Sequence, residues 1–297
     1  MRHDVSFTSF GETCRGWLYR PDGPTTLRPA IVMSHGLSAV KEQRLHPFAE
    51  RFAHEGFVVL VFDYRHLGAS DGDPRGRIAP QLQHDDIRAA LSFLVDQPGV
   101  DAKRIALWGT SYSGGHALHV GALDPRVAAV LVQAPAIAIA QAVRAMSGAE
   151  GFSTLLAALA GDHALRNAGG EGQRLPITAA DGGPSFLPGR EAHDWFTGTA
   201  RQAPSWLNST TLESIARGLD YTPGALIELI SPRPLLIQAA ADDSIIPLAH
   251  IQDAFARAGE PKTLQVLQCG HFDLYQGPFH DQALEGQVAW LRTNLRP

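Results

Sequence analysis

A serine between a buried strand and a helix is the feature that most limits how this chain can fold. The apolar run Arg104–Trp108 leads into Gly109-Thr110-Ser111-Tyr112-Ser113-Gly114-Gly115, and a helix-like segment begins near His116. So sharp a turn strains the backbone of the serine, and bulky residues two positions away on either side would clash. The small residues Gly109, Ser113 and Gly114 fit this requirement. The sequence therefore predicts a strand–turn–helix unit that exposes the side chain of Ser111.

Strands and helices alternate on both sides of this unit. The run Phe57–Phe62 is apolar and rich in β-branched residues, which is typical of a strand that is covered on both faces. Other expected strands are Thr13–Arg20, Ala30–His35, 128–133, 234–239 and 263–267, and expected helices lie near 45–52, 87–95, 248–258 and 284–295. Such alternation predicts an α/β fold with a mostly parallel sheet and helices on both faces.

The composition changes between residues 137 and 230, where Gly, Ala and Pro are frequent. Helical pieces are expected near 138–145, 155–160 and 211–217, with an irregular run from Gly169 to Gly189. The alternation of strands and helices returns after this segment. We therefore expect residues 1–136 and 231–297 to form the core, and residues 137–230 to form an inserted helical cap, or lid.

Polar residues follow several of the predicted strands, and ligands of open α/β sheets bind at the carboxyl ends of strands. In chain order these residues are His35-Gly36-Leu37, Asp63-Tyr64-Arg65, Ser111, Asp242-Asp243 and Gly270-His271. A serine, an acid and a histidine thus occur in the order nucleophile, acid and base.

Four of these fragments resemble motifs of the α/β-hydrolase superfamily. Ser34–Leu37 resembles its oxyanion loop, Phe62–Gly72 its D-x-R-x-x-G-x-S turn, Ala240–Pro247 its acid loop, and Gly270-His271-Phe272 its terminal loop. The Gly-x-Ser-Tyr-x-Gly-Gly form is similar to the elbows of X-Pro-peptidase-like hydrolases. The layout of the chain also resembles acetyl-xylan-esterase-like hydrolases and fungal polyketide-releasing thiohydrolases.

This resemblance implies a role for each residue. Ser111 would attack an acyl carbon, His271 would act as base and then as acid, and Asp243 would hold the imidazole. The backbone N–H groups of Leu37 and Tyr112 would form the oxyanion hole. Supporting positions are His35, which is expected to shape the oxyanion loop, and Gly36, Gly109, Ser113 and Gly114.

Each role has an alternative in the sequence. Ser111 could be an ordinary turn serine, His271 a solvated loop histidine, and Ser113 or Asp242 could replace Ser111 or Asp243. Asp63 and Arg65 are expected to tie their loop through charged hydrogen bonds. Asp85 and Asp86 are expected to mark an acidic first turn of their helix. The aromatic residues of the cap could line an acyl pocket or form the cap's own core: Phe152, Phe186, Trp195, Phe196 and Trp206.

The composition limits the other function classes. The net charge of −5 argues against a nucleic-acid partner. The sequence contains no uninterrupted run of about 18 apolar residues, so no membrane span is expected. Cys14 and Cys269 form no metal-type pair, and no metal or cofactor is expected. The first residues lack the apolar core of a signal peptide, so we expect a cytoplasmic protein. The sequence does not determine the oligomeric state, and a homodimer is possible.

These observations predict a cofactor-free serine hydrolase that cleaves carboxylic esters or thioesters through a Ser111 acyl-enzyme. Its partner would be a small-molecule acyl substrate. A peptidase or an acyltransferase could use the same triad, and so could a C–C bond hydrolase. A non-catalytic binding protein on the same scaffold is the remaining alternative, although such a scaffold would be expected to lose a triad member.

Overall fold

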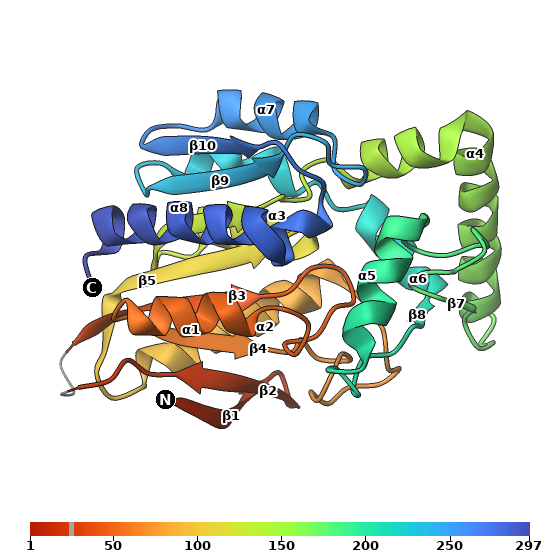
Figure 1. The fold of residues 1–297 in the computed structure, drawn as a ribbon. Coiled ribbons are helices and arrows are strands. Elements are labelled where there is room, and N and C mark those ends of the chain that lie inside the picture. The colour runs from red at the N-terminus through yellow and green to blue at the C-terminus, as the bar shows by residue number, and fades with distance from the viewer. Residues whose placement is uncertain (24–26) are drawn as a thin grey trace.

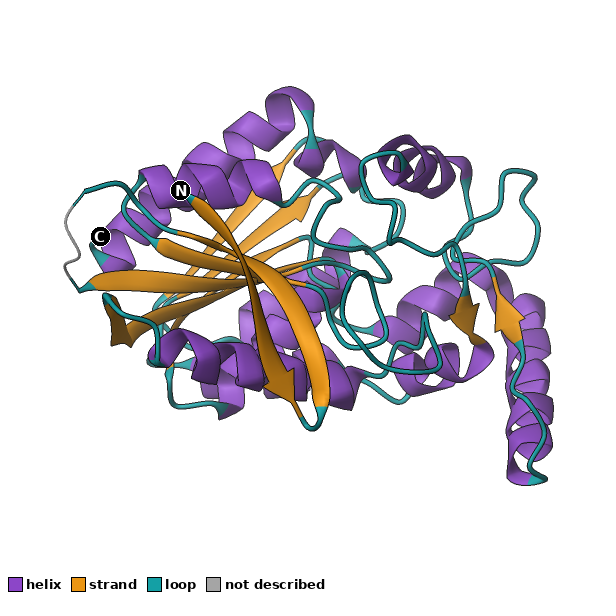
Figure 2. Cartoon of the chain, turned by 90° about the horizontal axis from the view of Figure 1, so that it is seen from below, coloured by secondary structure: helices purple, strands orange, loops and turns teal. Residues whose placement is uncertain are grey.

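One sheet with helices on both faces forms the centre of the molecule in the computed structural model, which describes residues 1–23 and 27–297 (Figures 1 and 2). Eight strands lie in the order β1-β2-β4-β3-β5-β6-β9-β10. Their bounds are β1 Arg2–Ser9, β2 Glu12–Tyr19, β3 Arg28–Ser34, β4 Val58–Phe62, β5 Val100–Thr110, β6 Val127–Gln133, β9 Leu235–Ala240 and β10 Lys262–Leu267. The β1–β2 and β2–β4 pairs are antiparallel and the other pairs are parallel. The α/β fold predicted from the sequence is confirmed.

The two faces of the sheet pack against different helices. The bounds of these helices are α1 His46–His54, α2 Pro80–Val95, α3 Tyr112–Leu123, α7 Leu248–Arg257 and α8 Gly277–Leu295. Alternate residues of β4 enter the two cores, with Leu60 on the face covered by α2, α3 and α7, and Val59 and Val61 on the face covered by α1 and α8. This alternation is the period-two pattern of a strand, and burial on both faces explains why β4 is continuously apolar.

The edge strand β1 was not predicted from the sequence. Its residues are mostly exposed and polar, so they carry no apolar pattern that distinguishes a strand from a loop. Pairing with β2 along its full length gives this strand its backbone partners. Its position therefore depends on the tertiary structure more than on its own composition.

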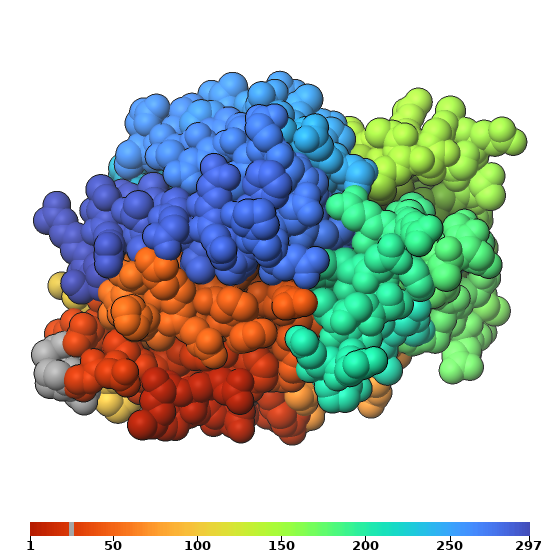
Figure 3. Space-filling model, viewed as in Figure 1, coloured from red at the N-terminus to blue at the C-terminus, as the bar shows by residue number. Residues whose placement is uncertain are grey.

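The segment between β6 and β9 lies beside the carboxyl ends of the strands (Figure 1). It contains α4 Ile139–Asn167, the ribbon of β7 Arg174–Leu175 and β8 Thr210–Thr211, α5 Arg190–Ala200, α6 Leu212–Leu219 and the 3₁₀ helix η1 Pro223–Ile230. In the space-filling view this green segment lies against the orange and blue parts of the chain, and α4 projects beyond them (Figure 3).

The helices of this segment were predicted in part, since the pieces near 138–145 and 155–160 both lie in helix on either side of Gly148. The two pieces belong to one long stretch, α4, which is interrupted only at Gly148 with φ 68° and ψ 175°. The helix α5 was not predicted, although its buried residues Ala192, Trp195, Phe196 and Thr199 recur at helical spacing.

Candidate active site

The turn between β5 and α3 holds Ser111 in a left-handed conformation, with φ 54° and ψ −121°. Such a conformation costs about 1–3 kcal/mol for a residue other than glycine. The turn is closed by hydrogen bonds from the N–H of Ser111 to the carbonyl of Gln133 (2.9 Å) and from the N–H of Gly114 to the carbonyl of Ser111 (2.9 Å). The surrounding structure therefore maintains the strained serine.

The neighbours of Ser111 are small because the backbone is crowded there. A Cβ on Gly109 would overlap the carbonyl oxygen of Ser113, and a Cβ on Gly114 would lie 2.7 Å from the Cα of Pro135. Ser113 is fully buried in the first turn of α3. Its hydroxyl donates to the carbonyl of His35 and contacts the Tyr64 hydroxyl at 2.8 Å. This geometry leaves Ser111, rather than Ser113, facing the open space above the sheet.

His271 lies between Ser111 and Asp243. Its Nε2 is 3.1 Å from the Oγ of Ser111, and its Nδ1 is 2.7 Å from the Oδ2 of Asp243. The carboxylate of Asp243 is oriented in turn, since its Oδ1 accepts hydrogen bonds from the N–H groups of Ile245 (2.8 Å) and Ile246 (2.7 Å). The carboxylate accepts a hydrogen bond from the N–H at Nδ1, so the lone pair of Nε2 faces the serine hydroxyl.

Asp242 lies outside this line of hydrogen bonds. It is exposed, and its backbone N–H donates to the carbonyl of Cys269 at 3.0 Å. The side chains of Asp243 and His271 are almost fully buried, with exposed fractions of 0% and 2%. The structure thus brings Ser111, Asp243 and His271 together, and it places Asp242 at the surface of the same loop.

The loop after β3 approaches Ser111 closely. A Cβ on Gly36 would lie 3.0 Å from the Cβ of Ser111, and Leu37 lines the space beside the serine. Within the described residues, the backbone N–H groups of Leu37 and Tyr112 donate no hydrogen bond to the protein. Both groups are therefore free to bind an oxygen near the Oγ of Ser111.

The His35 ring fixes the start of this loop. Its Nδ1 accepts a hydrogen bond from the N–H of Gly36 at 2.8 Å, and its Nε2 contacts the carbonyl of Gln43. These partners require the proton on Nε2. Burial lowers the pKa of His35 to about 4. The ring is therefore neutral at pH 7 and acts as a structural brace for the loop.

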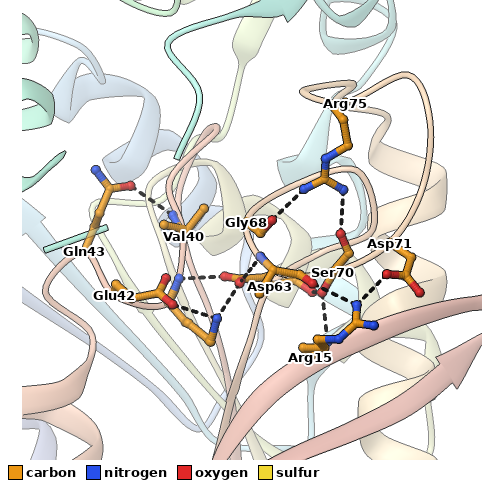
Figure 4. Close-up of polar contacts among 11 residues, drawn as sticks. Arg15, Val40, Glu42, Gln43, Asp63, Gly68, Ser70, Asp71 and Arg75 are labelled. Atoms are coloured by element: carbon orange, nitrogen blue, oxygen red, sulfur yellow. Dashed lines mark hydrogen bonds and ion pairs between the residues drawn. The ribbon is translucent and has the colours of Figure 1, made fainter. Parts of the chain in front are cut away.

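Asp63 anchors the far end of the same loop (Figure 4). Its carboxylate accepts hydrogen bonds from the N–H of Lys41 (2.7 Å) and the N–H of Ala69 (2.9 Å), and it pairs with the Lys41 ammonium at 2.7 Å. The side chain of Gln43 spans the loop, accepting from the N–H of Val40 at 3.0 Å. These contacts hold the loop from both sides of Leu37.

Arg65 also makes the charged hydrogen bonds that were expected, although its partner is Asp86 and not Asp63. Arg65 pairs with the buried Asp86 and donates from its backbone N–H to the same carboxylate at 2.9 Å. Asp63 and Arg65 both make charged hydrogen bonds, each to its own partner. The expectation for Asp85 and Asp86 was wrong, because the first turn of α2 holds no acidic residue and Asp86 lies deeper in the helix, facing the core.

An apolar cleft, called here the proximal cleft, opens beside Ser111. Its other walls come from the oxyanion loop, α4 and the loops before α5 and α7, and include Leu37, Ile137, Ile139, Ala142, Val143, Met146, Phe186, Leu187, Ile245 and Ile246. Residues of α4 at positions 139, 142, 143 and 146 have helical spacing, so the pattern of apolar residues could have identified this wall. Of the aromatic residues named from the sequence, Phe186 lines this cleft.

A smaller cleft lies on the other side of Ser111, next to His271. Trp195 and Phe196 line it, together with Phe272 and Tyr275. Trp206 stacks on Phe196, with ring centroids 5.3 Å apart, and lines neither cleft. Phe152 lines neither cleft as well. The two readings of the cap aromatics thus apply to different residues, since Trp206 belongs to a small core and Phe186 faces the substrate space.

Among residues 1–23 and 27–297, no three His, Cys, Asp or Glu side chains are grouped so that they could hold a metal ion. In the same residues, no helix is both long and apolar enough to cross a membrane.

Comparison with known proteins supports the assignment suggested by this geometry. Residues 31–286 match the alpha/beta hydrolase family. The quorum-quenching protein AidA of Acinetobacter baumannii (strain MDR-ZJ06) is 31% identical over 294 residues, covering 97% of this chain and 94% of AidA. A thiohydrolase of Eupenicillium brefeldianum is 29% identical over 299 residues, covering 98% of this chain and 94% of the thiohydrolase.

A third relative, the polyketide transferase grgF of a Penicillium species, is 31% identical over 298 residues, covering 99% of this chain and 97% of grgF. The crystal structure of GrgF superposes with a TM-score of 0.84 at 29% identity and covers 99% of both chains. Fold and comparisons together define an enzyme of the hydrolase class. The chain belongs to the alpha/beta hydrolase family.

Proposed function

We propose that the protein cleaves thioesters or carboxylic esters through an acyl-enzyme formed on Ser111. The observation that carries this proposal is the line of hydrogen bonds from Asp243 through His271 to the Oγ of Ser111. A neutral serine hydroxyl is a weak nucleophile, and a base within hydrogen-bond reach activates it. The relatives named thiohydrolase and polyketide transferase favour thioesters among the possible substrates.

In the first half-reaction, Nε2 of His271 takes the proton from Ser111 as Oγ bonds to the acyl carbon. The carbonyl oxygen of the substrate becomes an oxyanion, which the N–H groups of Leu37 and Tyr112 stabilise. Asp243 stabilises the imidazolium while it exists. His271 then gives its proton to the departing thiolate or alkoxide as the bond to the acyl carbon breaks, leaving the acyl group on Ser111.

In the second half-reaction, water attacks the acyl-enzyme, with His271 as base, and releases the carboxylic acid. An alcohol in place of water would give acyl transfer, and the name of the relative grgF is the observation that favours this second candidate. We place the acyl group in the proximal cleft, because its walls are apolar. The leaving group then lies on the His271 side, where it receives its proton. Residues 137–230 act as the cap that supplies most of these walls.

A fluorophosphonate probe tests the nucleophile. We expect the native protein to be labelled on Ser111, as located by peptide mass spectrometry. Ser111→Ala should abolish the labelling, while the matched variant Ser113→Ala should keep it. Label that persists on Ser111→Ala would place the nucleophile elsewhere.

A substrate panel tests the reaction. Among thioesters, p-nitrophenyl esters and Xaa-Pro amides with comparable acyl groups, we expect the thioesters or the esters to have the highest kcat/KM. Adding an alcohol acceptor and measuring the ratio of ester to acid products separates transfer from hydrolysis. Preferential cleavage of Xaa-Pro amides would contradict the proposal in favour of a peptidase.

A further inference from the structure

The proximal cleft continues into a second cleft, called here the distal cleft. Val143, Met146 and Phe186 line both of them. These three side chains come from α4 and from the loop before α5, so they form a shared wall rather than a barrier of backbone. The space beside Ser111 and the space farther along α4 are therefore neighbours that meet at these three side chains.

The remaining walls of the distal cleft are largely apolar. Leu155 and Ala158 come from α4, Leu212 and Ile215 from α6, and Leu175 from β7. Leu212 and Ile215 pack with Leu159 in a small buried cluster, against which Leu155 and Phe186 also pack. Four polar residues, Ser147, Gln173, Arg174 and Ser185, also line this cleft, so an apolar group would contact the apolar side of it along α4 and α6.

The interruption of α4 allows one helix to follow both clefts. Residues before Gly148 face the proximal cleft, and Gly151, Leu155 and Ala158 after it face the distal cleft. Figure 1 shows the helix changing direction at this point. From Ile139 to Ala158 the wall follows roughly 28 Å of helix, at about 1.5 Å per residue. A short acyl group on Ser111 fills only the first part of this length.

A second continuation of the proximal cleft has a different chemical character. It passes Ile137, Ala138 and His250 and reaches Gln141, Asp253 and Arg257. Methylene groups gain little from a wall that carries charged and hydrogen-bonding side chains, whereas they gain free energy from each apolar contact that removes them from water. The branch along α4 has the larger share of apolar side chains in its wall and is therefore the better suited to a hydrocarbon chain.

We propose that the proximal and distal clefts together form one site for a long acyl chain, with its carbonyl carbon at Ser111 and its far end in the distal cleft beside Leu155. This inference rests on the proposed acyl-enzyme. It makes the enzyme selective for acyl length, with Val143, Met146 and Phe186 at the junction that the chain must pass.

Chain-length dependence is the first test. We expect kcat/KM for butanoyl, octanoyl and dodecanoyl thioesters of N-acetylcysteamine to rise with acyl length. Each additional buried methylene group should raise kcat/KM by at most about fourfold, and the rise should stop when the distal cleft is full. A kcat/KM that is flat or falls from butanoyl to dodecanoyl overturns the proposal.

Adjacent leucines provide a matched pair of variants. Leu155 lines the distal cleft, whereas Leu156 is 45% exposed and lines neither cleft. Leu155→Asp should lower the dodecanoyl-to-butanoyl ratio of kcat/KM at least tenfold, while Leu156→Asp should keep the native ratio. Leu155→Phe retains an apolar side chain in the fold but shortens the cleft, and it should also lower the ratio. Equal ratios for the Leu155 and Leu156 variants contradict the proposal.

Binding without turnover separates this inference from the proposed function. In the Ser111→Ala background, titration calorimetry should show dodecanoyl thioester binding more tightly than butanoyl thioester. Leu155→Asp should weaken the binding of dodecanoyl thioester at least tenfold, whereas Leu156→Asp should leave it unchanged. Loss of these differences rejects the long acyl site even if Ser111 is the nucleophile. If the probe does not label the protein but dodecanoyl thioester still binds more tightly than butanoyl thioester, the acyl-enzyme is rejected and the long acyl site is retained.

Discussion

The hydroxyl of Ser113 donates a hydrogen bond to the backbone carbonyl of His35, so the nucleophile turn and the oxyanion loop are directly joined. Because its proton is used in this bond, Ser113 accepts the hydrogen bond from the Tyr64 hydroxyl at 2.8 Å. A glycine, which is usual at this position of a hydrolase elbow, could make neither bond. Ser113 thus joins two loops that, in the proposed mechanism, act on the same substrate oxygen.

Ser113→Ala tests this connection. It leaves the His35 carbonyl and the Tyr64 hydroxyl without their partner, which should lower the free energy of unfolding by about 1–3 kcal/mol. We also expect a lower kcat, by less than the about 10²–10³ that loss of an oxyanion donor costs. Thermal denaturation and steady-state kinetics measure the two effects. Tyr64→Phe removes only one of the bonds and should have the smaller effect on kcat; the reverse order would argue against this role of Ser113.

The acid of the triad gives a second prediction. Asp243→Asn should lower kcat by up to about 10⁴, because an amide cannot hold the His271 tautomer that accepts the serine proton. Asp242→Asn is the matched control, since Asp242 is exposed and makes no contact with His271. Circular dichroism establishes that both variants are folded, and initial rates on a p-nitrophenyl ester measure activity. Similar losses for the two variants would leave the assignment of the acid without support.

The lowered pKa values of three buried histidines determine a pH dependence of the free energy of unfolding. Burial lowers the pKa of His35 to about 4 and that of His116 to about 3, from the ordinary 6.5, and it also lowers the pKa of His84. The unfolded chain therefore binds protons below about pH 6.5 that the folded protein does not yet bind. The free energy of unfolding should fall as the pH drops from about 6.5 towards 4, by up to about 1.4 kcal/mol per pH unit for each histidine.

The variant His116→Gln isolates one of these contributions. His116 contacts the Oε1 of Gln83 at 2.9 Å and the Tyr221 hydroxyl at 3.1 Å, and a glutamine amide can form hydrogen bonds without binding a proton. Urea denaturation between pH 7 and pH 4 should show a shallower pH dependence for the variant than for the native protein. Parallel curves for the two proteins would contradict the assignment.

The sequence predicts most of the core because burial imposes regular patterns on it. The two-sided burial of β4 produces a continuous apolar run, and the α1 residues Phe48, Ala49 and Phe52 show the helical period. Ser111, Asp243 and His271 each follow a strand, so their meeting at one edge of the sheet was predictable from topology. The contact of Lys41 with Asp63 had no such signal, because it joins two loops whose spacing is set only by the folded chain.

The segment between β6 and β9 was less predictable for a related reason. Its longest helix, α4, buries few of its residues, so tertiary contacts rather than a strong pattern determine where it ends. In α4 only Leu159 and Asp162 are buried, although the helix runs from Ile139 to Asn167. The walls of the proximal and distal clefts come mainly from this segment, so the proposed acyl site could be recognised only in the three-dimensional structure.

The close approach of Gly36 to the nucleophile gives the last prediction. A Cβ at this position would lie 3.0 Å from the Cβ of Ser111 and 3.4 Å from the carbonyl of Thr110. Gly36→Ala should therefore push the loop after β3 slightly away from Ser111 and lower kcat, by less than the about 10²-fold that a misplacement of roughly 1 Å costs. Gly161→Ala is the control, because its Cβ would meet nothing within 4 Å and alanine favours a helix by up to about 1 kcal/mol. Kinetics and thermal denaturation of both variants separate the effects: the first should lose activity and remain folded, and the second should remain active and become slightly more stable. An unchanged kcat for Gly36→Ala would mean that the loop can move aside without losing its position on the oxyanion.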